Sequence, residues 1–496
     1  MCEAYQNLVD RFQQIYRLQH LGNMARWDQA TMMPSGGNQA RGEALAELDA
    51  LLHNLLINKK VKGWIDQAKQ RSPGDDIAAS IREMEQQWSQ ASLIPESLIK
   101  AKTIASNKCE YAWRSQRPEN DWQGFSSNLK EVIQLTREEA QIRADYDKVS
   151  PYDALLNLYE PGMTSNCIDL LFGDLTSWLP GFIEQAVELQ KSQPVIKPEG
   201  IFTTDSQKNL GLEVMKLLKF DFNHGRMDTS AHPFCGGVSE DVRMTTRYRN
   251  DDFIESLMAT IHETGHARYN QNLPLATRHL PVGSYRSMGI HESQSLFFEM
   301  QMGRSPEFLS LLQPLIIQHL CNNQPKPYTD LNNLKRMYTR VRPGFIRVEA
   351  DEVTYPAHVV LRYEIERDLV NGTIEVDDIP ELWNQKMKHY LQVDVGNQHG
   401  KGCMQDIHWP MGAIGYFPSY TLGAMYAAQF FAALKKSLPN VEEHIQQGRL
   451  EPVFEWLNQN IWSQGCRYNT GELVIRATGE PLNSTYFKKH LQQRYL

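Results

Sequence analysis

The sequence predicts a mainly helical protein that carries one small antiparallel sheet, and three observations support this fold class. Residues 4–19 and 42–58 repeat apolar side chains at the 3.6-residue spacing of amphipathic helices. Between Phe220 and Arg249, β-forming residues alternate in short pieces around a turn at Gly236-Gly237. Beyond this stretch the helical spacing returns. Further helices are expected at residues 165–193, 206–218, 252–270, 288–302, 355–370, 379–390, 420–438 and 441–447.

Composition excludes several classes of protein. The chain of 496 residues has 51 Lys and Arg against 59 Asp and Glu, a formal charge of −8, which gives no basic surface for nucleic acid. The sequence contains no run of about 18 apolar residues, so no membrane span is predicted. The start of the chain lacks the apolar core of a signal peptide, and the seven cysteines include no C-x-x-C pair. We therefore expect a cytoplasmic protein that binds neither nucleic acid nor membranes.

The sequence shows no sign of a division into several domains. The sequence contains no internal repeat, low-complexity tract or long polar linker that would separate independent domains. We expect one domain over residues 1–496. Within it, a helical N-terminal part covers about residues 1–200, and the part from about 220 to 430 holds the motifs described next.

The strongest chemical signal is His262-Glu263-Thr264-Gly265-His266, an H-E-x-x-H motif. It falls in the predicted helix 252–270. Two imidazoles at i and i+4 project from one helix face, which is the geometry that grips a single Zn²⁺ ion. Glu263 lies about 100° further round the helix, where it can reach a zinc-bound water without occupying a ligand position. The motif predicts a catalytic metal site.

A hydrolytic zinc ion needs a third protein ligand and one open position. The metzincin continuation requires Gly at 269 and His at 272, but the chain has Tyr269 and Asn272, so that class is excluded. The next predicted helix offers Glu292 as the third ligand. Glu299 lies on the same helix face and is the alternative, although a role in orienting a ligand histidine suits it as well.

Such a site predicts a reaction type more closely than a substrate. Zinc acidifies its water and polarises a carbonyl, while Glu263 takes the proton and passes it to a leaving amine. Amide hydrolysis follows. The motif leaves open whether the amide lies within a polypeptide or at its end.

Six motifs in one order identify a resemblance. They are His232-Pro233-Phe234, Asp241-Val242-Arg243-Met244-Thr245, the H-E-x-x-H helix, His291-Glu292-Ser293-Gln294, Ile346-Arg347-Val348-Glu349-Ala350-Asp351 and Gly402-Cys403-Met404-Gln405-Asp406-Ile407-His408-Trp409. The sequence resembles the carboxypeptidase Taq family of zinc metallocarboxypeptidases, of the HExxH gluzincin type. Trp27-Asp28 and Met33-Pro34 also resemble the family, so the likeness extends to the start of the chain.

The resemblance implies a large two-lobed helical body with a deep active-site cleft. It further implies a cytoplasmic homodimer that removes C-terminal residues from peptides with broad specificity. The cofactor that the resemblance implies is one Zn²⁺ per chain, and Co²⁺ is expected to be able to substitute for it.

The family's residue roles carry over to matching positions. His262, His266 and Glu292 are the implied metal ligands, and Glu263 is the implied general base and acid. Arg347 is the implied partner of the substrate's terminal carboxylate, because a guanidinium offers a bidentate fork.

Other residues of the site are assigned less specifically. His232 and His408 are candidates for contacting the substrate or the oxyanion. Tyr420 resembles the tyrosine that donates to the developing charge of the intermediate, with Tyr416 as the alternative. The polar motif residues Asp241, Arg243, Gln405 and Asp406 are expected to support the site from behind.

Two other readings fit the zinc motif itself. A zinc oligoendopeptidase would share the ligands and Glu263 but lack a site for a terminal carboxylate. A helical scaffold with structural zinc is disfavoured, because such sites usually have four protein ligands rich in Cys and no Cys falls inside either ligand helix.

Overall fold

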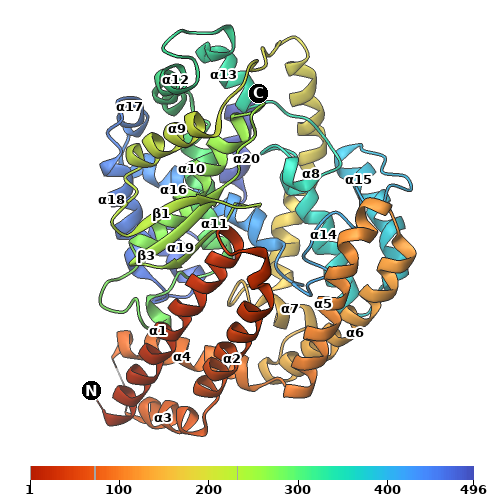
Figure 1. Cartoon of the computed structure of the whole chain (residues 1–496), viewed down its shortest axis with the longest axis vertical. Coiled ribbons are helices and arrows are strands. Elements are labelled where there is room, and N and C mark those ends of the chain that lie inside the picture. The colour runs from red at the N-terminus through yellow and green to blue at the C-terminus, as the bar shows by residue number, and fades with distance from the viewer. Residues whose placement is uncertain (1, 72–73, 232) are drawn as a thin grey trace.

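The computed structural model describes residues 2–71, 74–231 and 233–496, and over these ranges the chain is mainly helical (Figure 1). It begins with α1 (Glu3–Thr31), α2 (Asn38–Leu56), α3 (Lys59–Gln70) and α4 (Asp75–Ser92). The predicted helices 4–19 and 42–58 lie within α1 and α2. These four helices share a core of Leu8, Phe12, Ile15, Val61, Ile65 and Met84, which is also contacted by Leu280 and Val282 from far along the chain.

Five more helices precede the sheet: α5 (Glu96–Glu119), α6 (Trp122–Asp147), α7 (Pro151–Leu156), α8 (Ser165–Gln190) and α9 (Thr204–Leu217). Side-chain caps begin several of them. Asp121 accepts a hydrogen bond from Gly124 N at the start of α6, and Thr203 accepts one from Ser206 N at the start of α9. In Figure 1, α5 and α6 form the flank opposite the sheet.

The sheet has three strands, β1 (Gly225–Thr229), β2 (Cys235–Val238) and β3 (Asp241–Thr246), in the order β1-β3-β2. It lies within the predicted stretch, but the prediction of a purely antiparallel sheet is wrong. β2 and β3 pair antiparallel with Gly237 opposite Val242, whereas β1 and β3 pair parallel with Met227 opposite Met244.

The mixed pairing has a local cause. The connection after β1 crosses to the far side of β3, so the hairpin returns with β3 in the middle. The Thr245 hydroxyl holds both ends of this crossing: it lies 2.7 Å from Ser230 Oγ and accepts a hydrogen bond of 3.1 Å from Phe234 N.

Three helical elements meet beside the sheet. α10 (Ile254–Gln271) packs on β3, and α11 (Met288–Leu296) runs into a π-helical segment, η3 (Phe297–Gly303). The single helix expected at 288–302 therefore changes its winding at Phe297. The long helix α16 (Pro418–Ser437) packs closely along α11.

The remaining helices surround this centre. They are α12 (Pro306–Leu320), α13 (Leu331–Tyr338), α14 (Tyr355–Val370), α15 (Ile379–Leu391), α17 (Val441–Gln446), α18 (Glu451–Asn460), α19 (Thr470–Thr478) and α20 (Thr485–Tyr495). Short 3₁₀ turns occur at η1 (Ser35–Gly37), η2 (Pro281–Gly283), η4 (Pro327–Thr329), η5 (Arg347–Glu349), η6 (Val376–Asp378) and η7 (Trp462–Gln464).

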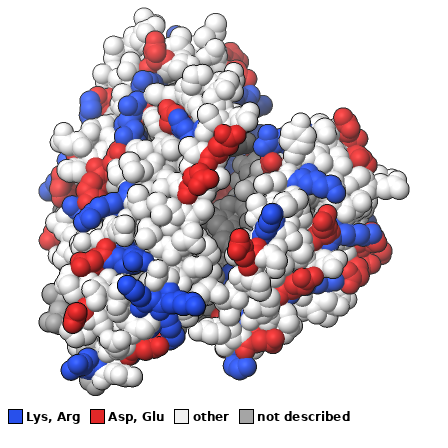
Figure 2. All heavy atoms as spheres, turned by 60° about the horizontal axis from the view of Figure 1, so that its bottom comes forward, with Lys and Arg blue, Asp and Glu red and all other residues white. Residues whose placement is uncertain are grey.

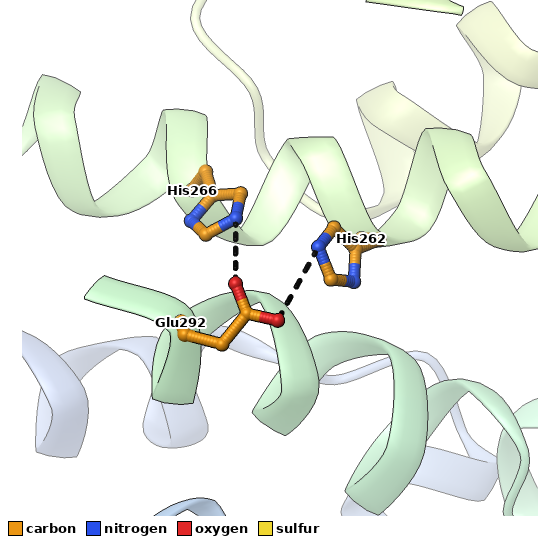
Figure 3. Close-up of side chains that lie close together, drawn as sticks. All are labelled: His262, His266 and Glu292. Carbon is orange, nitrogen blue, oxygen red and sulfur yellow. Dashed lines mark ion pairs between the residues drawn. The ribbon is translucent and has the colours of Figure 1, made fainter. Parts of the chain in front are cut away.

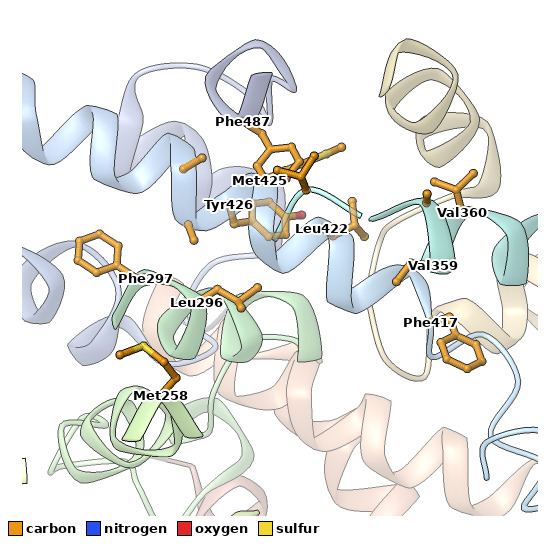
Figure 4. Packing of buried hydrophobic residues seen from close by; sticks show 14 of the residues in the cluster. Met258, Leu296, Phe297, Val359, Val360, Phe417, Leu422, Met425, Tyr426 and Phe487 are labelled. Atoms are coloured by element: carbon orange, nitrogen blue, oxygen red, sulfur yellow. The ribbon is translucent and has the colours of Figure 1, made fainter. Parts of the chain in front are cut away.

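The main hydrophobic core lies around α16. Figure 4 shows Leu422 and Met425 of α16 among Leu296 of α11, Phe297 of η3 and Phe487 of α20. Leu422, Met425 and Phe297 are fully buried. Burial of large apolar side chains of this kind is the main favourable contribution to folding. It gives the helices at the centre of the molecule a rigid support.

The surface is deeply hollowed on one face, where a larger and a smaller mass stand apart (Figure 2). The hollow agrees with the two-lobed shape that the family resemblance implies. Among the helices of the described part of the chain, none combines the length and the apolar character needed to cross a membrane.

Candidate metal centre

Three potential ligands converge between α10 and α11 (Figure 3). His262 and His266 lie one turn apart on α10, and their Nε2 atoms are 4.0 and 3.4 Å from the two carboxylate oxygens of Glu292 on α11. One ligand atom from each of the three residues lies within 4.8 Å of the others. Two imidazole nitrogens and one carboxylate oxygen form a donor set that suits Zn²⁺ and leaves a fourth position open.

The helices can approach this closely because two glycines lie at their contacts. A Cβ at Gly265, between the two histidines, would lie 2.5 Å from the carbonyl oxygen of Gln294 on α11. A Cβ at Gly423 of α16 would lie 2.7 Å from Cγ of Glu292. Both distances are shorter than nonbonded atoms tolerate, so any larger residue would push α11 away.

His262 is oriented by an ionic chain. Its Nδ1 lies 2.8 Å from Glu299 Oε2, and the other oxygen of Glu299 pairs with Arg304 at 2.6 Å. This contact turns Nε2 toward the ligand cluster. Burial alone would lower the pKa of His262, but the hydrogen bond and charge of Glu299, together with the charge of Glu292, raise it to about 10 in the metal-free protein.

His266 is held differently. Its Nδ1 is buried and has no hydrogen-bond partner in the part of the chain that the structure describes. The ring instead stacks on His291, with centroids 4.3 Å apart and planes 14° from parallel. His291 is fixed in turn by Asn270, whose Oδ1 lies 3.1 Å from its Nε2.

Glu263 lines the cleft beside the ligands. Burial raises the pKa of its carboxyl group, and the neighbouring charges of His262 and His266 act in the opposite direction. No hydrogen bond to its carboxylate is present among the described residues, so the group is free to receive a proton from a reactant.

The cleft has a volume of about 900 Å³ and extends well beyond the ligands. Its wall includes β2, Tyr416 and Tyr420 beside Glu292, and one face of α1 with Tyr16, Gln19, Asn23 and Trp27. The N-terminal helices therefore supply one side of the cleft.

Tyr420 connects the cleft to two predicted site residues behind it. Its hydroxyl is 3.2 Å from His408 Nε2, and its ring centroid is 5.0 Å from the Arg347 guanidinium carbon. Neither His408 nor Arg347 is among the described residues that line the cleft. Burial, with Arg347 nearby, lowers the pKa of His408 to about 4, so this imidazole is neutral at pH 7.

Arg347 is buried and already partly paired. Asp406 Oδ1 accepts hydrogen bonds of 3.1 and 2.8 Å from its Nε and Nη2, and the Tyr355 hydroxyl lies 2.5 Å from Nη1. Gln405 accepts a hydrogen bond of 2.7 Å from Arg347 N. Two of the five guanidinium N–H groups remain outside these contacts. Gln405 and Asp406 thus contact Arg347, and their supporting role in the site stays a prediction.

Of the remaining predicted residues, Asp241 and Arg243 lie in the described part of the chain and His232 does not. Arg243 lines the cleft, pairs with Asp241 at 2.5 Å and lies over the Trp27 ring at 4.8 Å. His232 lies outside the described residues, and its role stays a prediction.

The order of the motifs and the geometry of the ligands both point to one family, and a direct comparison decides it. The model of the family described as carboxypeptidase Taq (M32) metallopeptidase matches residues 7–495. The chain belongs to this family.

Similar proteins cover the chain from end to end. Thermostable carboxypeptidase 1 of Thermus thermophilus is 35% identical over 504 residues, covering 99% of this chain and 98% of that protein. Carboxypeptidase 1 of Bacillus subtilis is 34% identical over 492 residues, covering 98% and 97%.

Solved structures agree with this relationship. Metallocarboxypeptidase 1 of Trypanosoma cruzi is 42% identical and superposes with a TM-score of 0.97 over 99% of both chains. A Pyrococcus furiosus carboxypeptidase is 31% identical and superposes with a TM-score of 0.95, covering 100% of this chain and 99% of that one. The chain is thus an M32 metallocarboxypeptidase that removes C-terminal residues. The comparisons favour this activity over the alternative of a zinc oligoendopeptidase.

Some residues of this M32 site were not expected from the sequence. His291 stands in a family motif, but no sequence signal indicates its stacking on His266, and Asn270 carries no pattern that separates it from ordinary helix residues. Glu160 contacts both α11 and α16 from a distant connection. No local signal marks it, because its partners are set only by tertiary packing.

Proposed function

We propose that this carboxypeptidase uses one Zn²⁺ per chain, held by His262, His266 and Glu292. The observation that carries the proposal is the convergence of these three donors within 4.8 Å beside Glu263. When bound, Zn²⁺ acts as a Lewis acid that polarises the scissile carbonyl and acidifies a water molecule. Co²⁺ has similar ligand preferences and is proposed as a functional substitute.

We propose Glu263 as the group that moves the proton. It takes a proton from the attacking water and then donates it to the leaving amine nitrogen. Its burial supports this role, because the raised pKa makes the carboxylate a stronger base than an ordinary glutamate and so a better acceptor of the proton from water.

The tyrosines at the cleft are proposed to stabilise the charge that develops on the carbonyl oxygen. Tyr420 is the first candidate because His408 Nε2 lies 3.2 Å from its hydroxyl and can orient it. Burial raises the pKa of both Tyr420 and Tyr416, which keeps each a hydrogen-bond donor at neutral pH. His408 is then a residue that acts through Tyr420.

Arg347 is proposed to meet the terminal carboxylate of the peptide. The cation is fixed by Asp406 and Tyr355 and keeps two N–H groups outside those contacts. The guanidinium carbon of Arg347 lies 5.0 Å from the ring centroid of Tyr420, a residue that lines the cleft, so the two proposed substrate contacts are neighbours. A buried carboxylate needs such a partner, since its desolvation is strongly unfavourable.

The substitution Glu263→Gln tests the proton transfer. The amide keeps the size of the side chain but cannot accept the proton, so kcat should fall by at least about 10²- to 10⁴-fold while metal content is unchanged. Steady-state kinetics and elemental analysis measure the two quantities. The matched control is Glu255→Gln on the same helix, which should leave both unchanged. Near-normal turnover of Glu263→Gln would show that the proton is handled elsewhere.

The terminal carboxylate is tested with free and C-terminally amidated peptides. Arg347→Ala should lower kcat/KM for free peptides, and the fall should correspond to a loss of about 2 to 4 kcal/mol in transition-state stabilisation. The amidated peptide should be a poor substrate of the wild type and should lose far less in the variant. Arg347→Lys keeps the charge without the fork and should be intermediate. Equal losses for both peptides would make Arg347 a structural residue.

We further propose that the enzyme is a cytoplasmic homodimer and that residues 1–496 form one domain. We also propose that it removes many different C-terminal residues from its peptide substrates. The contacts of Leu280 and Val282 with the N-terminal helices support one domain. Light scattering on the purified protein should give twice the chain mass. Digestion of peptides that differ only in the last residue should give similar rates for apolar and polar side chains.

A further inference from the structure

Glu160 lies in the connection between α7 and α8 and is only 1% exposed. No Lys or Arg of the described chain lies within ion-pair distance of it. Burial raises its pKa to about 7, although the hydrogen bond from Ser419 acts in the opposite direction. A buried carboxyl group without a paired cation is costly for a protein, so its presence calls for a specific role.

One oxygen of Glu160 joins two helices. Oε1 accepts a hydrogen bond from the backbone N–H of Gly289 and another, of 2.7 Å, from the hydroxyl of Ser419. The preceding residue adds a third link, because Tyr159 O accepts a hydrogen bond of 3.0 Å from Met288 N. Gly289 lies in the first turn of α11 and Ser419 in the first turn of α16.

These two first turns lead directly to functional groups. Glu292 follows Gly289 by about one turn of α11, and Tyr420 is the next residue after Ser419. The helices also touch where Gly423 lies against Glu292. Any slide of α16 along α11 would therefore change the distance between the metal ligand and the tyrosine hydroxyl.

We propose that Glu160 is a positioning residue for catalysis: through Oε1 it fixes the first turn of α11 against that of α16 and so sets Glu292 relative to Tyr420. The inference rests on the proposed roles of Glu292 as a ligand and of Tyr420 as a donor. Both bridging hydrogen bonds go to Oε1, and no Lys or Arg of the described chain pairs with the carboxyl group, although the Ser287 hydroxyl at the start of α11 also acts to lower its pKa. We therefore expect the reach of the side chain, rather than its charge, to be the property that the position needs.

Two substitutions of Glu160 separate the reach of the side chain from its charge. Glu160→Gln keeps an acceptor oxygen at the same length and should give kcat and metal release within about threefold of the wild type. Glu160→Asp keeps the charge but retracts the oxygens by one carbon–carbon bond, about 1.5 Å, so it cannot reach both helices. It should release metal to a chelator about tenfold faster or more and lose about tenfold or more in kcat, the scale for outer residues of metal sites.

Ser419→Ala cuts only the link to α16. It should lower kcat severalfold with little change in KM or metal release, because Tyr420 acts mainly in the transition state. In the double variant, Glu160→Asp and Ser419→Ala should not add their effects on kcat, since they break the same link. Thr203→Ala is the control: it removes a comparable cap at the start of α9 and should change neither quantity.

Two sets of measurements distinguish the possible failures. Glu292→Ala should lose metal and Tyr420→Phe should lose kcat; if either does not, the proposed function is wrong at that residue. If both behave as expected while Glu160→Asp and Ser419→Ala keep wild-type kcat and metal release, Glu160 is only structural and the inference is overturned. Equal damage from Gln and Asp at position 160 would also overturn it, because charge would then be the needed property. Should Glu160→Asp fail to fold, Ser419→Ala decides alone.

Discussion

His262 and His266 lie one turn apart on α10 and both present Nε2 to Glu292, yet their outer nitrogens meet different surroundings. Nδ1 of His262 is 2.8 Å from the carboxylate of Glu299, which Arg304 holds in turn. Nδ1 of His266 has no partner among the described residues, and the ring is held by stacking on His291.

The difference teaches that equal ligands need not be equally fixed. A charged hydrogen bond sets the ring orientation of His262 and raises the basicity of its ligand nitrogen. A stacked ring restricts the plane of His266 but leaves its electronic character largely alone. We therefore expect the metal to depend on both ligands equally, but on their supports unequally.

Removal of a ligand should have the largest effect. His262→Ala and His266→Ala each leave two of three protein donors, so metal content should fall from about one ion per chain to near zero. Elemental analysis after dialysis measures this. His279→Ala, at the cleft but outside the ligand set, should keep its metal. Full occupancy in His266→Ala would contradict the assignment.

Loss of the ionic support should come next. Glu299→Gln removes the charge that orients His262, so metal affinity should fall by about 10- to 100-fold, measured by competition with a coloured chelator. The unfolding midpoint of the metal-free protein should be compared in parallel, so that a general loss of stability is recognised.

The matched change on the other side is His291→Ala, for which we expect a loss of less than about tenfold in affinity. His291→Phe keeps a ring that can stack and should lie near the wild type. If His291→Ala costs as much affinity as Glu299→Gln, the two ligands are supported equally and the comparison fails.

The smallest effect concerns pH. In the metal-free protein the pKa of His262 is raised from 6.5 to about 10, so the charged pair with Glu299 contributes fully below pH 6.5 and is lost as the pH rises through about 10. The midpoint difference between metal-free wild type and metal-free Glu299→Gln, of the order of a few degrees, should shrink over this range. Thermal unfolding with chelator at pH 6.5, 8 and 10 tests it, and a constant difference would refute it.

The fold could be predicted where local spacing decides the structure. The apolar repeats of α1 and α10 are visible in the sequence; α10 lies where expected, whereas α1 continues twelve residues beyond the predicted end at residue 19. The parallel pairing of β1 with β3 could not be predicted, because it depends on a crossing connection that Thr245 holds from another strand. The π-helical winding from Phe297 was equally hidden, since apolar spacing continues through it.

The candidate site divides in the same way. His262, Glu263 and His266 stand at a spacing that chemistry explains, and Glu299 could be named as a ligand or as an orienting residue before its contact with His262 was known. Glu160 could not be found, because its partners lie far along the chain and only packing brings them together.

The connection between α10 and α11 has a consequence for biosynthesis. Leu280 and Val282 complete the core of the N-terminal helices, although those helices leave the ribosome long before them. A nascent chain therefore carries an unfinished hydrophobic cluster until this connection emerges, and we expect the early helices to reach their final packing only then. Closure of that cluster also anchors the segment that leads into α11. A newly made chain should thus acquire the ability to take up metal only after its first helices have matured.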